Sequence, residues 1–255
     1  MFSLENKTAL ITGSSRGIGR AIALRMAEAG ARVIISSRKA TACEQVVDEI
    51  ITAGGNAISM PCNVSDLSAI EEMVDKIQSE LGSVDILVGN AAANPHYGPI
   101  VDIDESRFDK IIDTNVKSNL WLCKHLLPGM AANQDGVIIF VTSIAGLQGT
   151  DDIAAYGLSK AAESSLARSL AVGWGKHNIR VNCIAPGLVK TDFAKALWED
   201  KARLEAAEAA YPLKRIGVPD DIAGIAVFLA SRAGAFITGQ TIVADGGITI
   251  SGNRS

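Results

Sequence analysis

Short runs of apolar, mostly β-branched residues alternate along the chain with longer stretches whose apolar residues recur at helical spacing. The short runs predict strands at 8–11, 33–36, 57–61, 84–88, 136–142, 179–184 and 240–244. The longer stretches predict helices at 17–30, 41–53, 67–81, 104–130, 153–175 and 220–230, with a charged, Ala-rich helical stretch after residue 190. Strands and helices that alternate in this way are typical of βαβ units with parallel strands.

The strand segments are nearly continuous Val and Ile runs, as expected for a parallel sheet that is covered on both faces. No long Pro-, Gly- or Ser-rich linker divides the chain, and no internal repeat occurs. We therefore predict a single doubly wound α/β domain of the Rossmann type over residues 1–255, with about seven parallel strands and helices on both faces.

Composition fits this fold and excludes several classes of function. The chain has 255 residues, 48% of them hydrophobic and 20% charged, which is too apolar for a disordered protein. Its 24 Lys and Arg against 28 Asp and Glu give a net charge of −4, which does not favour binding to nucleic acid. The sequence also has no apolar run long enough for a membrane span and no signal-peptide pattern at its start, so we expect a soluble, cytoplasmic protein.

The cysteines and histidines are too far apart in the sequence to form a metal-ligand motif. The cysteines stand at 43, 62, 123 and 183, and the histidines at 96, 125 and 177. We expect buried, reduced thiols and no metal site.

A glycine-rich segment lies exactly between the first predicted strand and the first predicted helix. It runs from Thr12 to Gly19 and contains Gly13, Ser15, Arg16, Gly17 and Ile18. Glycines at such a junction let the chain turn tightly, and the amides that open the helix can receive a phosphate. The position at the first strand–helix junction predicts a dinucleotide site, whereas a glycine triplet alone would fit an ordinary glycine-rich turn equally well.

The end of the second strand predicts which dinucleotide is bound. An acid at this place holds the free ribose hydroxyl of NAD, and an Arg accommodates the extra phosphate of NADP. Here the sequence is Ser36-Ser37-Arg38-Lys39, with no carboxylate. Ser37, Arg38 and Arg16 can all donate to a phosphate, so we predict NADP(H) rather than NAD(H).

Four further positions carry polar groups that can contribute to chemistry on a carbonyl. Tyr156 and Lys160 stand four residues apart, on one face of a predicted helix, and a nearby ammonium favours the phenolate form of a tyrosine. Ser143 ends the fifth strand, at the sheet edge where ligands bind in such folds. Asn115 lies in a helical pattern despite its poor helix propensity. Each of these alone could be an ordinary surface or packing residue.

In combination, these residues resemble the short-chain dehydrogenase/reductase family over practically the whole chain. The matching landmarks are the glycine motif at 12–19, Asn90-Ala91-Ala92-Ala93, Asn115, Ser143, the pair Tyr156 and Lys160, and Pro186-Gly187 followed by Thr191. The resemblance implies an oxidoreductase in which the cofactor supplies hydride and the protein supplies positioning and protons.

The resemblance also implies a role for each catalytic residue. Tyr156 would protonate the carbonyl oxygen during reduction, and Ser143 would orient and polarise that carbonyl. Lys160 would lower the pKa of Tyr156 and hold the nicotinamide ribose, while Asn115 would keep a water in a proton relay from Lys160.

The resemblance also implies cofactor contacts by residues that stand at or after the ends of the predicted strands. Asn90 would line the cofactor cleft, Val189 and Thr191 would hold the nicotinamide carboxamide, and Pro186 and Gly187 belong to the same segment. Asn63-Val64 stands where many members have Asp-Val beside the adenine. Gly89 replaces a second Asn that is common before Asn90, which predicts a looser strand end.

Within the family, the sequence bears a closer likeness to NADPH-dependent carbonyl and retinal reductases of animals. We expect reduction of a small-to-medium hydrophobic ketone, aldehyde or diketone. A beta-ketoacyl-(acyl carrier protein) reductase shares the same catalytic residues, but the turn at 133–136 lacks the basic residues that would attract an acidic carrier. A catalytically inactive NADP-binding protein is a third hypothesis, disfavoured by the intact Ser143, Tyr156 and Lys160.

Four expectations concern regions outside the catalytic group. The segment 192–214, which contains Phe193, Leu197, Trp198 and Tyr211, is either a substrate lid or an amphipathic helix packed on the core. His96 and Tyr97 either line the entrance to the same substrate site or lie in an exposed loop. The family pairs the helices at 104–130 and 153–175 across subunits, which implies a homotetramer. The animal enzymes end in a peroxisomal tripeptide, whereas this chain ends Asn253-Arg254-Ser255, so we expect no peroxisomal targeting.

Overall fold

Parallel strands form the centre of the molecule. The computed structural model describes residues 1–251, and within them seven strands form one parallel sheet in the order β3-β2-β1-β4-β5-β6-β7. The strands are β1 (Thr8–Thr12), β2 (Arg32–Ser36), β3 (Asn56–Ser59), β4 (Ile86–Gly89), β5 (Gly136–Val141), β6 (Ile179–Pro186) and β7 (Thr241–Ala244). The predicted doubly wound fold is confirmed.

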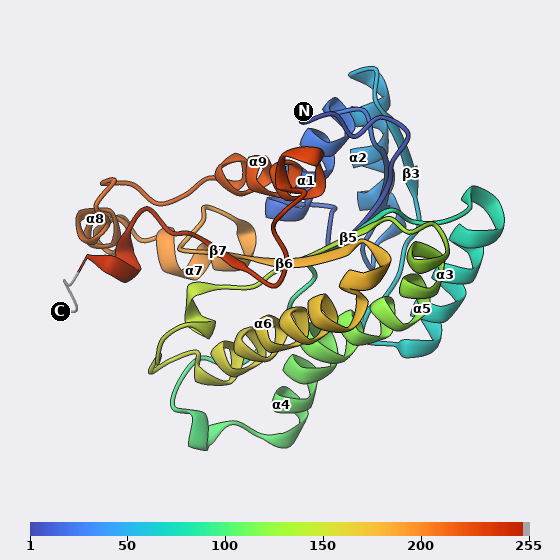
Figure 1. Cartoon of the computed structure of the whole chain (residues 1–255). Helices are drawn as coiled ribbons and strands as arrows, with labels where there is room; N and C mark the ends of the chain where they lie inside the picture. The colour runs from blue at the N-terminus through green and yellow to red at the C-terminus, as the bar shows by residue number, and fades with distance from the viewer. Residues whose placement is uncertain (252–255) are drawn as a thin grey trace.

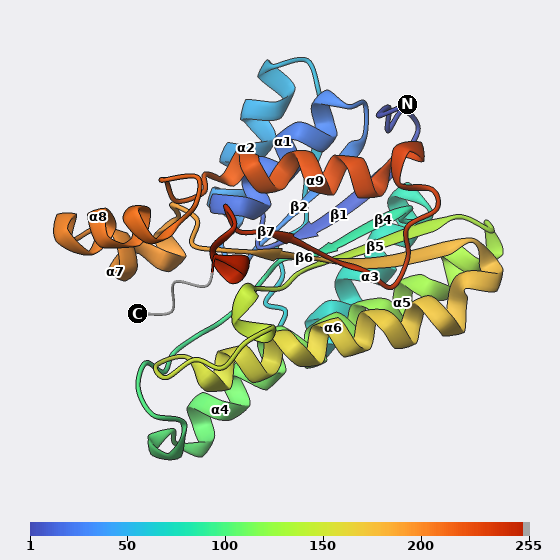
Figure 2. The same ribbon diagram turned by 60° about the vertical axis from the view of Figure 1, so that its left-hand side comes forward.

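Helices connect successive strands and cover both faces of the sheet (Figures 1 and 2). They are α1 (Gly17–Glu28), α2 (Ala40–Thr52), α3 (Leu67–Leu81), α4 (Glu105–Ile112), α5 (Ser118–Ala132), α6 (Ala154–Trp174), α7 (Lys195–Trp198), α8 (Lys201–Ala210) and α9 (Pro219–Ala230). Helices α1, α2 and α9 pack on one face, and α3, α5 and α6 pack on the other.

Each strand contributes to both cores because successive side chains point to opposite faces. Ile11 and Val88 belong to the core beneath α1 and α9, whereas Leu10 and Leu87 belong to the core beneath α3 and α5. All four side chains are fully buried. Burial on both faces explains why these strands have unbroken apolar sequences rather than alternating ones.

The predicted helix at 104–130 is not continuous. A wide π-helical turn, Asp113–Lys117, separates α4 from α5 and contains Asn115. Insertion of one residue into a helix produces such turns, which occur frequently at functional sites. The local apolar spacing continues across the turn, so periodicity alone did not reveal it.

The strand order places a crevice at one edge of the sheet. Strands β1 and β4 are neighbours, and the chain proceeds from β1 outward to β3 before it returns to β4. The carboxyl ends of the strands at such a reversal form the usual ligand crevice of doubly wound folds.

No helix among residues 1–251 is long and apolar enough to span a lipid bilayer. The terminal tripeptide 253–255, on which the targeting expectation rests, lies outside the described residues.

Candidate active site

A cavity of about 780 Å³ opens at the carboxyl edge of the sheet. Nearly all residues predicted from the sequence line it: Gly13, Ser15, Arg16, Gly17, Ile18, Ser37, Arg38, Asn63, Val64, Asn90, Ser143, Tyr156, Lys160, Pro186, Gly187, Val189 and Thr191. Two predicted residues, Gly19 and Asn115, lie behind the cavity wall rather than on it. The predicted site is therefore one continuous space built from segments along the whole chain.

The glycine loop between β1 and α1 has the shape that a pyrophosphate requires. Gly13 and Gly17 have φ angles of +65° and +56°, a region that side chains other than glycine rarely adopt. A Cβ atom on Gly19 would crowd the Gly13 carbonyl oxygen at 2.6 Å, so Gly19 allows close packing rather than direct contact with a ligand. Among residues 1–251, no side chain caps the start of α1, which leaves its first amides free to bind an anion.

Hydrogen bonds hold Asn90 beside this loop. The Thr12 hydroxyl accepts from the backbone amides of Asn90 and Ala91 at 3.0 and 3.1 Å. The Asn90 side-chain amide donates to the Thr12 carbonyl oxygen at 2.9 Å. These bonds join the ends of β1 and β4, so the crevice between the two strands has fixed walls.

One end of the cavity is basic. Arg16, Arg38 and Lys39 line it and are exposed to solvent, and Ser37 presents a hydroxyl beside them. Arg16 lies 3.7 Å from Asp192, an exposed pair that contributes little to stability. These donors fit the additional phosphate that distinguishes NADP from NAD.

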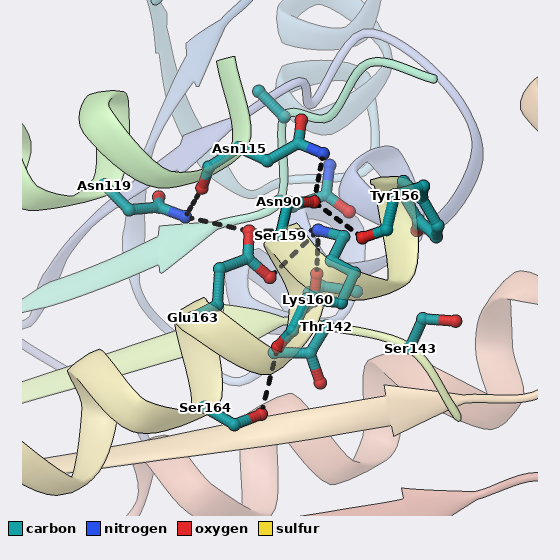
Figure 3. A network of polar contacts seen from close by, with 12 residues as sticks. Asn90, Asn115, Asn119, Thr142, Ser143, Tyr156, Ser159, Lys160, Glu163 and Ser164 are labelled. Atoms are coloured by element: carbon teal, nitrogen blue, oxygen red, sulfur yellow. Dashed lines mark hydrogen bonds and ion pairs between the residues drawn. The ribbon is translucent and has the colours of Figure 1, made fainter. Parts of the chain in front are cut away.

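The reactive groups of the cavity lining come from helix α6 and from the end of β5 (Figure 3). Tyr156 and Lys160 come from successive turns of α6, and the Lys160 Nζ lies 5.5 Å from the centroid of the Tyr156 ring. Ser143 follows β5, and its hydroxyl accepts a hydrogen bond from the amide of Ala145 at 3.1 Å. The centroid of the Phe193 ring lies 6.1 Å from that of the Tyr156 ring, and the two rings are tilted relative to each other.

The surroundings of Tyr156 raise the pKa of its phenol above that of a free tyrosine. Burial raises the pKa of the Tyr156 phenol, the Lys160 ammonium lowers it, Glu163 raises it and the Ser143 hydroxyl lowers it. The net pKa lies above the ordinary value of 10.0. The predicted effect of Lys160 thus has the right direction, although burial and Glu163 outweigh it in the net pKa.

Sequence reasoning missed Glu163, which forms a buried ion pair with Lys160. Both Glu163 carboxylate oxygens accept from Lys160 Nζ at 3.0 Å, and the Val141 carbonyl oxygen accepts from it at 3.0 Å. The exposed fractions of the two side chains are 1% for Lys160 and 0% for Glu163. Burial raises the pKa of Glu163 to about 7, against the stabilising effect of Lys160. The three-residue spacing on one helix was the available signal.

The predicted relay residue Asn115 has a structural role in the wall of the site. Its side-chain oxygen accepts from the amide of Ala93 at 2.8 Å, and its Nδ2 donates to the Ser159 hydroxyl at 2.9 Å. Its backbone carbonyl oxygen accepts from Asn119 Nδ2 at 2.9 Å, and that same amide group donates to Glu163 at 3.2 Å. Asn119 therefore connects the π-helical turn to the Lys160–Glu163 pair.

The segment after Thr191 forms part of the cavity wall. Phe193, Leu197 and Tyr211 line the cavity. The Trp198 indole instead donates to the Thr191 carbonyl oxygen at 2.9 Å, and the Tyr211 hydroxyl accepts from the amide of Leu188 at 2.7 Å. These contacts fix the aromatic residues against the rest of the protein.

The neighbouring loop places His96 and Tyr97 differently. Tyr97 lines the cavity, as one of the two readings of this loop expected. His96 is buried away from it, with its Nε2 3.0 Å from the Pro99 carbonyl oxygen. Nowhere in the described part of the chain do three or more His, Cys, Asp or Glu side chains come together in a metal-binding arrangement.

Comparison with known proteins identifies the family. The model of the enoyl-(acyl carrier protein) reductase family matches residues 13–249. Dehydrogenase/reductase SDR family member 4 of Bos taurus is 42% identical over 244 residues, which cover 96% of this chain and 88% of the relative. The 2-dehydro-3-deoxy-D-gluconate 5-dehydrogenase of Pseudoalteromonas atlantica is 38% identical over 247 residues, covering 96% and 97% of the two chains.

A solved structure shows the same fold with a cofactor. The gluconate 5-dehydrogenase of Burkholderia cenocepacia, in complex with NADP and tartrate, superposes with a TM-score of 0.93 at 30% identity and covers 97% of both chains. Together with the cavity that joins the glycine loop to Ser143, Tyr156 and Lys160, these matches show that the chain is an oxidoreductase of the short-chain dehydrogenase/reductase family.

Proposed function

We propose that this protein is an NADP(H)-dependent carbonyl reductase. It reduces a small-to-medium hydrophobic ketone, aldehyde or diketone to an alcohol, and it runs the reaction in reverse as an alcohol dehydrogenase. The observation that carries this proposal is the convergence of the Tyr156 phenol, the Ser143 hydroxyl and the Lys160 side chain on the cavity into which the glycine loop also opens. Bound NADPH supplies the hydride, and the protein's own residues hold the carbonyl and deliver the proton.

Each catalytic side chain has a defined task in this proposal. Ser143 donates to the carbonyl oxygen and orients it, while Tyr156 gives its phenolic proton to the same oxygen as the alcohol forms. Lys160 provides a fixed positive charge beside the phenol and holds the ribose of the nicotinamide. Asn115, through its bonds to Ala93 and Ser159, keeps the loop after β4 and helix α6 in register.

The basic end of the cavity supports NADP(H) as the cofactor. Arg38 and Arg16 can each donate to the ribose phosphate, and the Ser37 hydroxyl adds a further donor. The solved relative with bound NADP has the same fold, although a similar solved structure, a 7 alpha-hydroxysteroid dehydrogenase, is complexed with NADH. Asn90, Val189 and Thr191 are proposed to line the nicotinamide half of the same cofactor.

The substrate end of the cavity favours a molecule with a second polar group. Ile144, Ile153 and Leu197 supply apolar walls. Asn94 and Thr150 also line this space and add polar side chains to it. A diketone or hydroxyketone, with a second polar group beside an apolar body, suits such a mixed wall.

The rival function, reduction of a beta-ketoacyl thioester on acyl carrier protein, has weaker support. An acidic carrier needs a basic surface at which to dock. The turn at 133–136 provides instead Asp135, which forms an ion pair with Lys7 at 2.5 Å. A catalytically inactive NADP-binding protein would have no need for the Ser143, Tyr156 and Lys160 group.

Initial rates with NADPH and NADH test the proposal directly. The panel contains an aliphatic diketone, an aromatic ketone, an aldehyde such as retinal, and an acetoacetyl thioester. We expect rapid NADPH oxidation with the free carbonyl compounds, fastest with the diketone, and little with the thioester. Activity confined to the thioester would establish the rival function, and no activity with any compound would overturn the proposed reductase.

Apolar side chains on α5 and α6 support a homotetramer. The helices that the family pairs between subunits carry exposed apolar side chains in the single chain. The exposed fractions are 41% for Leu120, 47% for Leu158 and 88% for Val172. Covering such side chains is favourable. Light scattering should give the mass of a tetramer, and a monomer at micromolar concentration would refute this assembly.

A further inference from the structure

A buried carboxyl group lies immediately behind the proposed proton donor. Glu163 has no exposed surface, and its carboxylate contacts two groups: the Lys160 ammonium, through both oxygens, and the side-chain amide of Asn119. A carboxylate in an apolar interior is unfavourable unless it is paired and hydrogen-bonded, and here both conditions are met. Figure 3 shows Glu163 and Asn119 on one side of Lys160 and Tyr156 on the other.

The space for this arrangement comes from Gly89 at the end of β4. A side chain at position 89 would overlap Asn119 Oδ1 and would approach Phe140 Cδ1 to 2.8 Å. The expectation of a loose strand end is therefore wrong, because the Asn119 amide fills the place beside this buried glycine. Gly89, Asn119 and Glu163 come from β4, α5 and α6, so three separate elements contribute to one polar cluster.

The charged and titratable groups around Glu163 are few. Helix α6 contributes Lys160 and Tyr156, and strand β6 contributes the buried thiol of Cys183, whose pKa is raised to about 12 by burial and by Glu163. Helix α5 contributes the uncharged Asn119, and β5 contributes the Val141 carbonyl. At neutral pH the thiol is uncharged, so the electrostatics of the cluster depend on Glu163, Lys160 and Tyr156.

We propose that Glu163 is a positioning residue of this active site: its carboxylate anchors the Lys160 ammonium and holds back deprotonation of Tyr156. The effect follows from charge. A phenolate at Tyr156 is attracted by Lys160 and repelled by a carboxylate behind that lysine, so the carboxylate makes the protonated phenol more favourable. A protonated Tyr156 is the form that reduces a carbonyl, and Glu163 therefore extends carbonyl reduction to more alkaline pH. The consequence for carbonyl reduction rests on the proposed function, because Tyr156 protonates a carbonyl only if the protein is a reductase.

Tyrosinate absorbance at 295 nm provides a test that does not depend on activity. The chain has three tyrosines, so the difference between a protein and its Tyr156→Phe counterpart isolates the titration of Tyr156. We expect Glu163→Gln to move this titration down by about one pH unit, a tenfold loss in proton affinity. Glu163→Asp keeps the charge and should retain most of the original value.

The matched control is Glu71→Gln, which removes one carboxylate from an exposed position on α3 and should leave the titration unchanged. Should Glu163→Gln fail to fold, Glu163→Met serves in its place. It removes the same carboxylate from the interior, so the Tyr156 titration should move in the same direction by a similar amount. A titration that stays in place or moves upward in the folded variant overturns the proposal.

The pH profile of turnover gives a second readout. In Glu163→Gln, the alkaline limb of carbonyl reduction and the acid limb of alcohol oxidation should both move to lower pH by the amount seen in absorbance. A loss of rate without a shift of either limb would indicate a merely structural role and would contradict the proposal. An absorbance shift in an enzyme that reduces no carbonyl would instead refute the proposed function and leave the coupling between Glu163 and Tyr156 intact.

Discussion

Gly89 lies directly against the side-chain amide of Asn119, so closely that any Cβ atom at position 89 would overlap Asn119 Oδ1. Asn119 in turn bonds to Glu163, which holds Lys160. The smallest residue in β4 is thus connected, through two buried side chains, to the proposed catalytic lysine.

Replacing Gly89 with Ala should therefore destabilise the protein by about 1–3 kcal/mol, as expected for overpacking of a filled interior. Urea unfolding measures the change. Gly173→Ala is the matched control, because a Cβ there meets nothing within 4 Å and the residue lies in helix α6. Alanine should leave stability unchanged or raise it at that position. Equal effects of the two substitutions would contradict the close contact.

Replacing Tyr156 with Phe should reduce kcat/KM for carbonyl reduction by about 10²–10⁴-fold, since the proton donor is removed. The ring and its packing against Phe193 remain, so NADPH binding, measured by the change in cofactor fluorescence, should be preserved. Tyr97→Phe, which changes another cavity tyrosine, should retain activity. Unchanged turnover in Tyr156→Phe would exclude this residue as the acid.

Arg38→Ala should weaken NADPH binding by about 10–100-fold, because a charge-assisted hydrogen bond to phosphate is lost. Binding of NADH, which lacks that phosphate, should change little. The ratio of the two dissociation constants is the quantity to measure. Lys201→Ala removes a cation whose side chain is 90% exposed on α8 and should alter neither constant. An equal loss for both cofactors would show that Arg38 does not recognise the phosphate.

Asp245 should make stability depend on pH in the acid range. Burial by itself would raise the pKa of Asp245, but hydrogen bonds from the Thr249 hydroxyl and from the amides of Thr249 and Gly247 hold it below the ordinary 3.8. A carboxyl whose pKa is lowered by folding contributes stability that is present above about pH 4 and is lost as the pH falls through the folded value.

Asp245→Asn should therefore cost about 1 kcal/mol at neutral pH, and the difference from the original protein should shrink below about pH 4. Urea unfolding at a series of pH values measures both quantities. Asp48→Asn, at an exposed position on α2, is the control and should show no such trend. A stability difference that persists in acid would mean that the charge of Asp245 contributes nothing.

The elements and most of the cofactor site could be predicted from local sequence. Helix α3 was expected at 67–81 and occurs there, because its apolar spacing and the Asp66 side chain, which accepts from two amides at its start, act within one segment. The glycine loop could also be predicted from local sequence. Gly13 and Gly17 have positive φ angles, which glycine adopts more readily than any other residue, so the glycines themselves indicate the turn. Catalytic residues were assigned through the family resemblance and not through spacing alone.

The polar cluster behind the site was not predictable in this way. Residues 89, 119 and 163 are far apart in the sequence, and each is unremarkable alone: a glycine in a strand, an asparagine in a helix and a glutamate that could face solvent. The π-helical turn at Asp113–Lys117 also escaped prediction because it leaves the apolar pattern nearly intact.

The sequence by itself determined the alternation of strands and helices, the glycine loop and the identity of the reactive side chains, because these depend on local periodicity and on residue chemistry. Tertiary structure decided how those side chains behave. The pKa of Tyr156 is raised even though Lys160 lowers it, because the value also depends on burial and on a carboxylate that packing brings behind Lys160. Distances between buried charges follow from how β4, α5 and α6 pack together, and that geometry is a property of the folded chain.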